Sequence, residues 1–299
     1  MRIVLTGSRG FIGSALTTAL KAGGHLVVPL VHSNAEPAPG SAAWNPEAGF
    51  LAVDALEASG AIVHLAGEPI ASARWSRAQR DRILNSRVKS TRLLCKTLEK
   101  MNSPPGIFVS ASAIGYYGDR GDEILTEESP PGRGFLADVC KQWEAETSPA
   151  AQRGIHVVLL RIGMVLSGKG GALARMLPAF RMGLGGAIGS GRQYMSWITL
   201  HDLVQIIQRC LTDPGLRGPV LAVAPNPVTN RDFTKTLARV LHRPAVLGVP
   251  ACAVRLAFGQ MADELLLASQ RARPEKLMAA GYNFKFPSVE SALRNALAL

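Results

Sequence analysis

TGSRGFIG, at residues 6–13, is the stretch that decides the fold of this chain. The residues before it, RIVLT (2–6), form a short apolar run rich in β-branched side chains, which predicts a buried strand. From Phe11 onward apolar residues recur on one helical face until the glycines at 23–24, which predict the end of a helix. HLVVPLV (25–31) predicts the next strand. The order is therefore strand, glycine turn, helix and strand.

The three glycines of that turn fit a dinucleotide-binding loop. In such a loop the first glycine, here Gly7, allows a tight turn, and the second, Gly10, lets the backbone approach a pyrophosphate. The third, Gly13, lets the helix pack closely against the strand. Free N–H groups at the start of the helix then face the phosphates. Because a strand precedes the turn and a helix and strand follow it, the sequence predicts a Rossmann-type dinucleotide site.

Charged residues near the turn favour NADP(H) over NAD. Enzymes that use NAD place an acidic residue at the end of the second strand, where it binds the ribose 2′-hydroxyl. Here His32 and Ser33 take that position, and no acid follows before Glu36. A guanidinium pairs well with a phosphate, so Arg9 is the predicted partner of the 2′-phosphate. The alternative is that Arg9 is a solvent-facing loop residue.

The alternation of strands and helices continues through most of the chain, which implies a parallel, doubly wound sheet. The predicted strands are AIVHLAG (61–67), GIFVSAS (106–112), HVVLLRIGMVL (156–166) and PVLAVA (219–224), and the predicted helices cover residues 76–100, 136–151 and 200–211. The predicted fold class is α/β, a Rossmann-like doubly wound parallel sheet with a smaller, mostly helical C-terminal lobe.

Two segments fall outside this alternation. Residues 168–198 are glycine-rich and irregular, and the tail from Asn226 onward holds two or three helices separated by prolines. We expect these segments to pack together as a smaller, substrate-side lobe. The predicted division is an NADP-binding Rossmann domain of residues 1–165 with 199–224, and a smaller lobe of residues 166–198 with 225–299.

Composition narrows the class of protein. The chain has 299 residues, a formal charge of +11 and four cysteines far apart in the sequence. The cysteine spacing argues against a disulfide scaffold or a metal site and favours a reducing, cytoplasmic compartment. No apolar run reaches membrane-spanning length. The charge permits a nucleic-acid partner, but no nucleic-acid motif accompanies it, so we expect a basic surface around a site for a polyanionic cofactor.

Further motifs lie in a fixed order along the chain. They are HLAGEPI (64–70), RILNSRVKSTRLL (82–94), SAIGYYGDRGDE (112–123), LRIGMVL (160–166), GGAIGSGRQYMSWI (185–198), APNPVTNRDF (224–233) and KLMAAGYNFKFPSVESAL (276–293). Together with TGSRGFIG they resemble the extended and atypical short-chain dehydrogenase/reductases. Within that group the chain is similar to the NADP-binding epimerase family proteins that end in a small C-terminal domain of unknown function. The resemblance covers essentially the whole chain.

The resemblance implies a set of cofactor contacts. Residues near the pyrophosphate and ribose would be Gly7, Arg9, Phe11 and Ile12, those near the 2′-phosphate His32 and Ser33, those near the adenine-side ribose and diphosphate Leu65, Ala66 and Gly67, and two further contacts Arg87 and Arg161. The family often has an arginine where this chain has His32 and Ser33, which leaves Arg9 as the principal cation. For Arg87 the alternative is a solvated helix face.

The catalytic residues of the superfamily are only partly present. Its chemistry needs a serine or threonine, a tyrosine that exchanges a proton, and a lysine four residues after the tyrosine. Ser112 matches the serine, although a turn-capping hydroxyl is an equal alternative. Lys141 lies in the expected helix, but Ala137 stands where the tyrosine belongs. Tyr116 and Tyr117 are the candidate substitutes, and we expect one of them to be packed in the interior.

Other polar residues have a structural and a functional interpretation. Glu68 follows a strand end and could serve as acid or base, or cap a helix. Arg192 could pair with a phosphate or carboxylate of the substrate. His201 and Asp202 open a helix, and we favour capping and packing for both. We expect four acids in the loop after the two tyrosines to be solvated, namely Asp119, Asp122, Glu127 and Glu128.

The sequence therefore predicts an NADP(H)-dependent oxidoreductase or epimerase of the atypical short-chain dehydrogenase/reductase type. Its substrate would be a small molecule, a sugar nucleotide or another carbonyl compound, and the sequence allows a homodimer. The competing interpretation is an NADP(H)-binding sensor that turns over slowly or not at all, which the missing tyrosine favours. A nucleic-acid partner ranks last.

Overall fold

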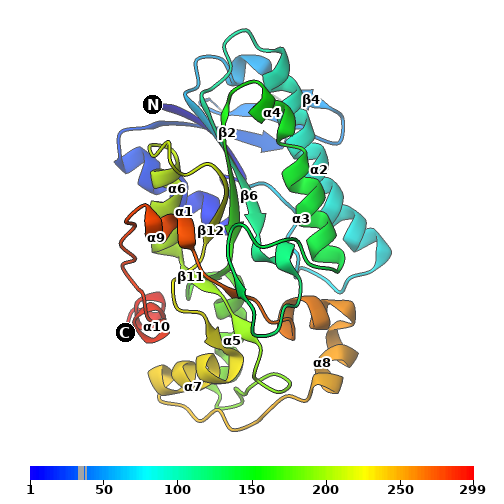
Figure 1. Cartoon of the computed structure of the whole chain (residues 1–299), viewed down its shortest axis with the longest axis vertical. Coiled ribbons are helices and arrows are strands. Elements are labelled where there is room, and N and C mark those ends of the chain that lie inside the picture. The colour runs from blue at the N-terminus through cyan, green and yellow to red at the C-terminus, as the bar shows by residue number, and fades with distance from the viewer. Residues whose placement is uncertain (33–36, 38) are drawn as a thin grey trace.

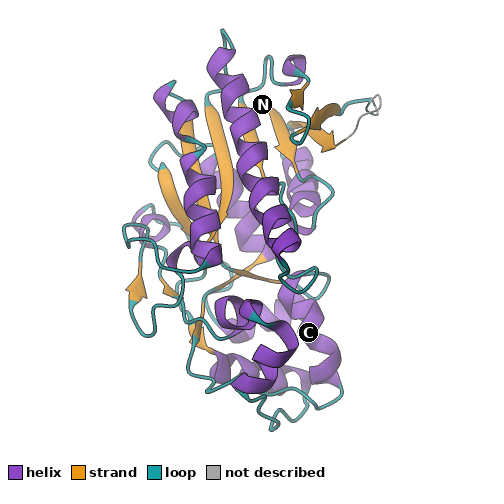
Figure 2. Ribbon diagram, turned by 90° about the vertical axis from the view of Figure 1, so that its right-hand side faces the viewer, coloured by secondary structure: helices purple, strands orange, loops and turns teal. Residues whose placement is uncertain are grey.

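An eight-stranded sheet lies at the centre of the larger lobe (Figure 2). The computed structural model describes residues 1–32, 37 and 39–299, so Ser33 and Glu36 lie outside the described residues. The sheet order is β12, β8, β6, β5, β1, β2, β3, β4, and neighbouring strands are parallel except β3 and β4. These strands are β1 (Arg2–Thr6), β2 (Leu26–His32), β3 (Ala42–Asn45), β4 (Phe50–Leu51), β5 (Ala61–His64), β6 (Ile107–Ala113), β8 (His156–Ile162) and β12 (Gly218–Ala222).

Helices cover both faces of this sheet (Figures 1 and 2). On one face α1 (Phe11–Ala22) packs against α6 (Leu200–Cys210). On the other face α2 (Arg77–Lys100) packs against α3 (Phe135–Ala145) and α4 (Ser148–Gln152). The molecule is thus three layers thick, as a doubly wound α/β fold requires.

The side chains of β1 alternate between two apolar cores. Ile3 and Leu5 are fully buried in the core beneath α1 and α6, whereas Val4 is fully buried in the core beneath α2. This period of two is what a strand covered on both faces requires. The Rossmann-like α/β fold predicted from the sequence is confirmed.

The order of the strands reverses between β1 and β5. From β1 the chain proceeds through β2 and β3 on one side, and from β5 through β6, β8 and β12 on the other. In open α/β sheets, ligands bind outside the carboxyl ends of the strands at such a reversal. Those ends are Thr6 and His64, which locates the expected cofactor crevice.

The helix predicted at 136–151 is two helices in the structure. The first, α3, ends at Ala145, and Pro149 stands in the first turn of α4. A proline has no N–H for the helical ladder and is tolerated only where a helix begins. The continuous helix was therefore a wrong prediction, and Pro149 was the signal against it.

The strand predicted at 156–166 is also divided. It forms β8 and then β9 (Met164–Leu166), with Gly163 between them. A Cβ at Gly163 would lie 2.7 Å from the Ser196 carbonyl oxygen, so only glycine fits at this crossing. The chain leaves the large sheet at that point and pairs with β11 (Trp197–Thr199).

The glycine-rich segment 168–198 is more regular than the sequence predicts. It contains α5 (Gly171–Arg181), whose buried face carries Leu173, Leu177 and Phe180 at helical spacing. The prediction of irregular structure was wrong for this part. Its many glycines and Pro178 obscured an amphipathic period that is present in the sequence.

The smaller, mostly helical C-terminal part lies beyond the carboxyl ends of the strands, at the bottom of Figure 1. We propose that its core is the apolar cluster formed by α5, α7, α10 and Trp197, which corresponds to the predicted second lobe. The remaining elements are η1 (Val53–Ala55), η2 (Ile114–Tyr117), β7 (Ile124–Leu125), β10 (Tyr194–Met195), β13 (Val228–Thr229), α7 (Asn230–Leu241), α8 (Ala251–Phe258), η3 (Ala262–Leu266), β14 (Arg271–Ala272), α9 (Glu275–Ala279) and α10 (Val289–Leu297). Within the described residues, no helix combines the length and the apolar character that a membrane span needs.

Candidate functional site

The glycine turn between β1 and α1 is packed tightly against the loop after β5. Gly7 has a φ of +70°, and a Cβ there would lie 2.9 Å from the Ala66 nitrogen. A Cβ at Gly13 would lie 2.1 Å from the Gly7 carbonyl oxygen, so any side chain would push the helix off the strand. The Gly10 N–H donates a hydrogen bond to that same oxygen over 2.9 Å. The backbone therefore has the form of a pyrophosphate cradle.

Arg9 stands at the exposed edge of this cradle. Its side chain makes no hydrogen bond or ion pair with the rest of the described chain. His32, at the end of β2, is exposed as well, and β2 lies directly beside β1. The first turn of α1 contains no acidic residue. The geometry thus leaves the Arg9 guanidinium available for an anion, and its pairing with a 2′-phosphate stays a prediction.

Phe11 and Ile12 begin α1 and anchor it. A Cβ at Gly170 would lie 2.6 Å from the Phe11 ring, so this ring lies directly against the backbone before α5. Ile12 is half-buried and packs on the core beneath α1 and α6. Because both side chains are used in packing, the backbone N–H groups are what these residues can offer a phosphate. Their cofactor contacts stay predictions.

A buried histidine fixes the loop after β5. Thr6 Oγ1 accepts hydrogen bonds from the Leu65 and Ala66 N–H groups, each over 3.1 Å, so it donates its own proton to His64 Nδ1 at 2.7 Å. His64 Nε2 then carries the ring proton and lies 3.1 Å from the Thr91 hydroxyl. Burial lowers the pKa of His64 from 6.5 to about 3, so the ring is neutral. This network holds the predicted contacts Leu65 and Ala66 beside the cradle.

The Arg87 side chain extends from α2 and lies against Gly67, in the loop after β5. Its Nη1 donates to the Ile83 carbonyl oxygen over 3.0 Å, and its guanidinium lies 5.2 Å from the centroid of the Trp143 ring. A Cβ on Gly67 would lie 3.1 Å from the guanidinium carbon, so the absence of a side chain there allows the backbone to contact the guanidinium closely. Burial lowers the pKa of Arg87. A held guanidinium beside the cradle suits an anionic ligand, and the predicted cofactor contact stays a prediction.

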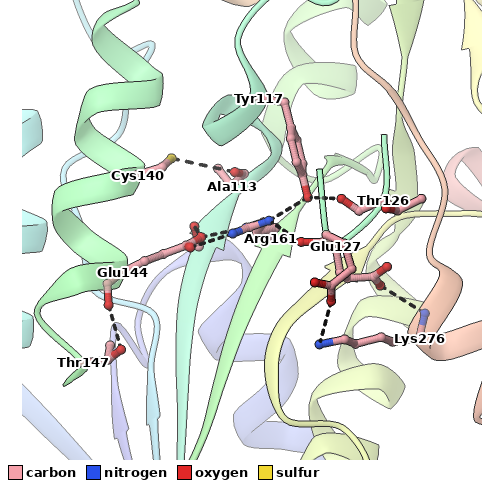
Figure 3. Close-up of polar contacts among 11 residues, drawn as sticks. Ala113, Tyr117, Thr126, Glu127, Cys140, Glu144, Thr147, Arg161 and Lys276 are labelled. Atoms are coloured by element: carbon pink, nitrogen blue, oxygen red, sulfur yellow. Dashed lines mark hydrogen bonds and ion pairs between the residues drawn. The ribbon is translucent and has the colours of Figure 1, made fainter. Parts of the chain in front are cut away.

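A buried ion pair lies at the carboxyl ends of β6 and β8 (Figure 3). Glu144 of α3 accepts two hydrogen bonds from the Arg161 guanidinium, each 2.9 Å long. The Ser112 hydroxyl donates to the same carboxylate over 2.6 Å. Ser112 and Arg161 are cross-strand partners, and each is only 3% exposed. The predicted serine is therefore held by a carboxylate that the sequence analysis did not identify.

The two predicted tyrosines flank Arg161 in different ways. Tyr117 is fully buried, donates to the Thr126 carbonyl oxygen and accepts from Arg161, both over 2.8 Å. Burial raises the pKa of Tyr117 to about 12, although Arg161 opposes the shift. Tyr116 is half-buried, with its ring centroid 3.6 Å from the guanidinium carbon, and its hydroxyl bonds no described residue. Tyr116 thus has the available phenol, while Tyr117 supports Arg161.

The Arg161 guanidinium makes hydrogen bonds to three residues of the protein. Besides Glu144 and Tyr117 it donates to the Glu127 carbonyl oxygen over 3.1 Å (Figure 3). Burial works against its charge, but the hydrogen bonds and charge of Glu144 outweigh burial and raise the pKa of Arg161. This geometry makes Arg161 the support of Glu144 and Ser112. Its predicted contact with the cofactor stays a prediction.

The face of α3 that meets the end of β6 carries neither tyrosine nor lysine. Lys141 points to solvent and pairs with Asp138 over 2.6 Å, so it is a surface residue. Cys140 instead faces the strand end, with its thiol 3.7 Å from the Ala113 carbonyl oxygen. Leu136, one turn earlier, would contact a Cβ on Gly115 at 3.2 Å. Burial raises the pKa of Cys140 to about 11, so its thiol stays protonated at neutral pH.

Glu127 is buried, and the expectation that it is solvated was wrong. Its Oε1 accepts hydrogen bonds from the backbone N–H groups of Leu221 and Lys276, over 3.2 Å and 3.3 Å. Its Oε2 has no partner among the described residues, and burial raises its pKa. The side chain ties the 118–134 loop to β12 and α9. Nothing in the local sequence distinguishes it from the exposed Glu128 beside it.

The remaining predicted residues are mostly structural or exposed. Thr199 caps α6, because its Oγ1 accepts the Asp202 N–H. The buried Asp202 carboxylate accepts the Thr199 hydroxyl proton and the Lys285 N–H, so it supports this cap and packs in the interior. His201 and Arg192 are exposed, and Glu68 is half-buried. Among the described residues, no group of His, Cys, Asp and Glu side chains could hold a metal ion.

The fold and the cradle define the class of this protein. Residues 3–223 match the model of the NAD dependent epimerase/dehydratase family, and residues 249–296 match a C-terminal domain of unknown function, DUF1731. The chain belongs to the NAD dependent epimerase/dehydratase family, as its motifs suggested.

Known proteins similar to the whole chain are also described as epimerase family proteins. "Epimerase family protein Mb2239" of Mycobacterium bovis is 44% identical over 294 residues, which cover 97% of this chain and 96% of that protein. The crystal structure of human epimerase family protein SDR39U1 with NADPH is 35% identical, covers both chains fully and has a TM-score of 0.88. The complex of MoeE5 with UDP-glucuronic acid and NAD has a TM-score of 0.77 at 18% identity, over 100% of this chain and 98% of that chain, which shows a shared fold.

Proposed function

We propose that this protein is an NADP(H)-dependent oxidoreductase or epimerase acting on a carbonyl compound or its alcohol. The observation that carries the proposal is the Ser112 hydroxyl, fixed over 2.6 Å by Glu144 at the strand end beside the dinucleotide cradle. NADPH, when bound, supplies a hydride to a carbonyl carbon. The protein then has to orient the carbonyl oxygen and deliver a proton to it.

The preference for NADP(H) rests on charge. Arg9 at the mouth of the cradle is free of protein partners among the described residues, and no acid occupies the first turn of α1. The human relative was solved with NADPH, which supports the same cofactor here. A free guanidinium favours a 2′-phosphate, whereas a carboxylate would repel it.

The side chains around Ser112 have separate roles in this proposal. Because Ser112 donates its proton to Glu144, its oxygen lone pairs can accept a hydrogen bond from the hydroxyl of the alcohol, which is the substrate of oxidation and the product of reduction. Arg161 holds the Glu144 carboxylate in position over 2.9 Å. Tyr116 has the unbonded phenol near this site and is the candidate proton donor in place of the usual tyrosine. Carbonyl reduction then consumes one hydride and one proton.

The test is turnover with matched variants. NADPH absorbance is followed while aldehydes, ketones and nucleotide sugars are offered to the purified protein. We expect oxidation with at least one of them, a drop of about a hundredfold in kcat for Ser112→Ala, and a smaller drop for Tyr116→Phe. Ser110→Ala, two residues earlier on the same strand, is the control. Wild-type turnover in Ser112→Ala would exclude the serine from catalysis.

A second function, an NADP(H) sensor, is favoured by one observation. The inner face of α3 carries Leu136 and Cys140, neither of which exchanges a proton at neutral pH. If tight NADPH binding is accompanied by no turnover of any offered carbonyl, the sensor is the better description. A cytoplasmic location and a homodimer stay predictions.

A further inference from the structure

A small cavity lies between η2, the start of α3 and the C-terminal part of the chain. Its volume is about 260 Å³. The apolar part of its wall comes from both lobes, and includes Leu136 of α3 and Leu267 after η3. The full lining is Gly115, Gly118, Asp119, Arg133, Leu136, Arg255, Asp263, Glu264, Leu267 and Ala268. Neither the cofactor cradle nor the buried ion pair accounts for this space.

The cavity adjoins the carboxyl ends of β6 and β8, where the reaction is proposed to occur. The inner face of α3 runs from Trp143, which lies beside Arg87, through Cys140 to Leu136, in steps of about one turn. Leu136 lines the cavity, and so does Gly115, three residues after Ser112. The cavity therefore adjoins the segment that follows the strand end holding the serine.

The acids in the cavity wall are all bound to donors. Glu264 caps α3, because its two oxygens accept the Phe135 and Leu136 N–H groups over 3.1 Å and 2.8 Å. Asp119 Oδ1 accepts the Ser269 N–H over 2.9 Å. Such carboxylates hold the two lobes together and leave little affinity for a further cation.

The two arginines in the wall differ. Arg255 is paired with Asp263 over 2.8 Å, so its charge is compensated. Arg133 has no ion pair, ring contact or side-chain hydrogen bond with any described residue. It is thus the uncompensated guanidinium of this cavity. An unpaired arginine beside an apolar surface suits a ligand that carries a carboxylate.

The backbone of Arg133 is held firmly, although its side chain is exposed. A Cβ at Gly118 would lie 2.6 Å from the Arg133 carbonyl oxygen, and one at Gly132 would lie 1.9 Å from the Tyr117 carbonyl oxygen. Gly134, which follows, has a φ of +111°. This close packing fixes the backbone of Arg133 at the wall of the cavity, from which its unpaired side chain can reach a ligand.

We propose that the cavity binds a small oxo acid or hydroxy acid whose carboxylate pairs with Arg133. Ligand pockets for drug-sized molecules measure about 300–1,000 Å³, so this one fits a smaller compound than a sugar nucleotide. The Arg133 guanidinium offers a partner for one carboxylate. The wall also holds Asp119, Asp263 and Glu264, of which only Asp263 pairs with an arginine among the described residues, so any further negative charge on the ligand is disfavoured. The inference deepens the proposed function and rests on it, since it names the class of substrate.

The experiment compares each acid with its own methyl ester. Succinate semialdehyde, levulinate and longer oxo acids are offered with NADPH, beside the corresponding esters. We expect wild type to favour the acid by about tenfold or more in kcat/KM. Arg133→Gln should remove that preference while changing the rate with the ester by less than about twofold. Arg133→Lys should restore part of it.

Arg217→Gln provides the matched control. Arg217 is exposed and lies just before β12, at the amino-terminal ends of the parallel strands, whereas the cavity lies beyond the carboxyl end of β6. This variant should therefore keep the wild-type preference. Equal rates for acid and ester in wild type, or a preserved preference in Arg133→Gln, would overturn the inference.

A binding measurement separates this inference from the proposed reaction. The same oxo acids are titrated calorimetrically into the protein saturated with NADPH. Binding that Arg133→Gln abolishes supports the cavity even if no carbonyl is reduced, in which case the proposed function alone has failed. Absence of binding, or binding that is equal in Arg133→Gln, overturns the assignment of the cavity.

Discussion

The two ends of the site are built in different ways. The cradle at β1 and β5 is made of backbone and glycine, from residues 6–13 and 64–67. The other end of the site, here called the edge, lies at the carboxyl ends of β6 and β8 and is made of side chains. Its residues Ser112, Glu144 and Arg161 come from three elements. A backbone cradle binds the phosphates shared by all dinucleotides, whereas a group of side chains sets one reaction. The cradle therefore carries features that dinucleotide-binding proteins share, whereas the residues of the proposed reaction lie at the ends of β6 and β8.

The largest effect is expected for a substitution that disrupts the cradle. Gly13→Ala would place a Cβ 2.1 Å from the Gly7 carbonyl oxygen, and neither backbone segment can yield without moving α1. We expect NADPH affinity to fall by more than about a hundredfold, measured by NADPH fluorescence titration. Gly23→Ala is the control, because φ there is −79° and the nearest neighbouring atom would be 3.4 Å away. Normal affinity in Gly13→Ala would show that α1 can shift without loss of the site.

The next prediction concerns a substitution that disrupts the ion pair between Arg161 and Glu144. Arg161→Met leaves the Glu144 carboxylate buried without its partner, which costs about 3–5 kcal/mol of the free energy of unfolding. Lys141→Met removes an exposed pair with Asp138 and should cost less than about 1 kcal/mol. Urea unfolding of both variants measures the difference. Equal losses would mean that Glu144 finds water or another donor once Arg161 is removed.

A pH dependence sharpens the contrast, because the histidine belongs to the cradle. The pKa of His64 is lowered from 6.5 to about 3 in the folded protein, so the unfolded chain takes up a proton first as the pH falls. The stability that neutral His64 contributes is fully present above pH 6.5 and is lost progressively toward about pH 3. The loss reaches about 2 kcal/mol at about pH 5.

The measurement is the free energy of unfolding between neutral pH and about pH 5, in wild type and in His64→Asn. The asparagine does not titrate, so the difference between the two proteins should shrink as the pH falls. A difference that stays constant would show that His64 is protonated in the folded state at higher pH than its burial implies.

The smallest effect concerns which dinucleotide the cradle prefers. Arg9→Ala should weaken NADPH binding by about tenfold, or about 1.4 kcal/mol, and leave NADH binding within about twofold. The reason is that only NADPH has a 2′-phosphate for the guanidinium. Lys21→Ala, in the last turn of α1, tests for a general effect of charge. Equal weakening of both cofactors by Arg9→Ala would remove its assigned role.

The cradle was predictable because its requirements are local. Gly7, Gly10 and Gly13 lie within one short stretch, and the periodicity on either side identifies the strand and the helix. The buried acids were not predictable in this way. Glu127 is buried and the Glu144 side chain is 10% exposed, and both find partners only because Leu221, Lys276 and Arg161 are brought to them by the fold.

The sequence by itself determined the alternation of the main strands and helices, the glycine turn and hence the expectation of a dinucleotide. It also showed that the tyrosine of the usual catalytic pair is missing, whichever residue of α3 is compared. Only the tertiary structure decided that Leu136 and Cys140, rather than Ala137 and Lys141, face the site. Successive side chains on a helix differ in direction by about 100°, so a shift of one residue changes which side chain faces the strand. Only the packing of α3 against β6 fixes which face of the helix is turned inward.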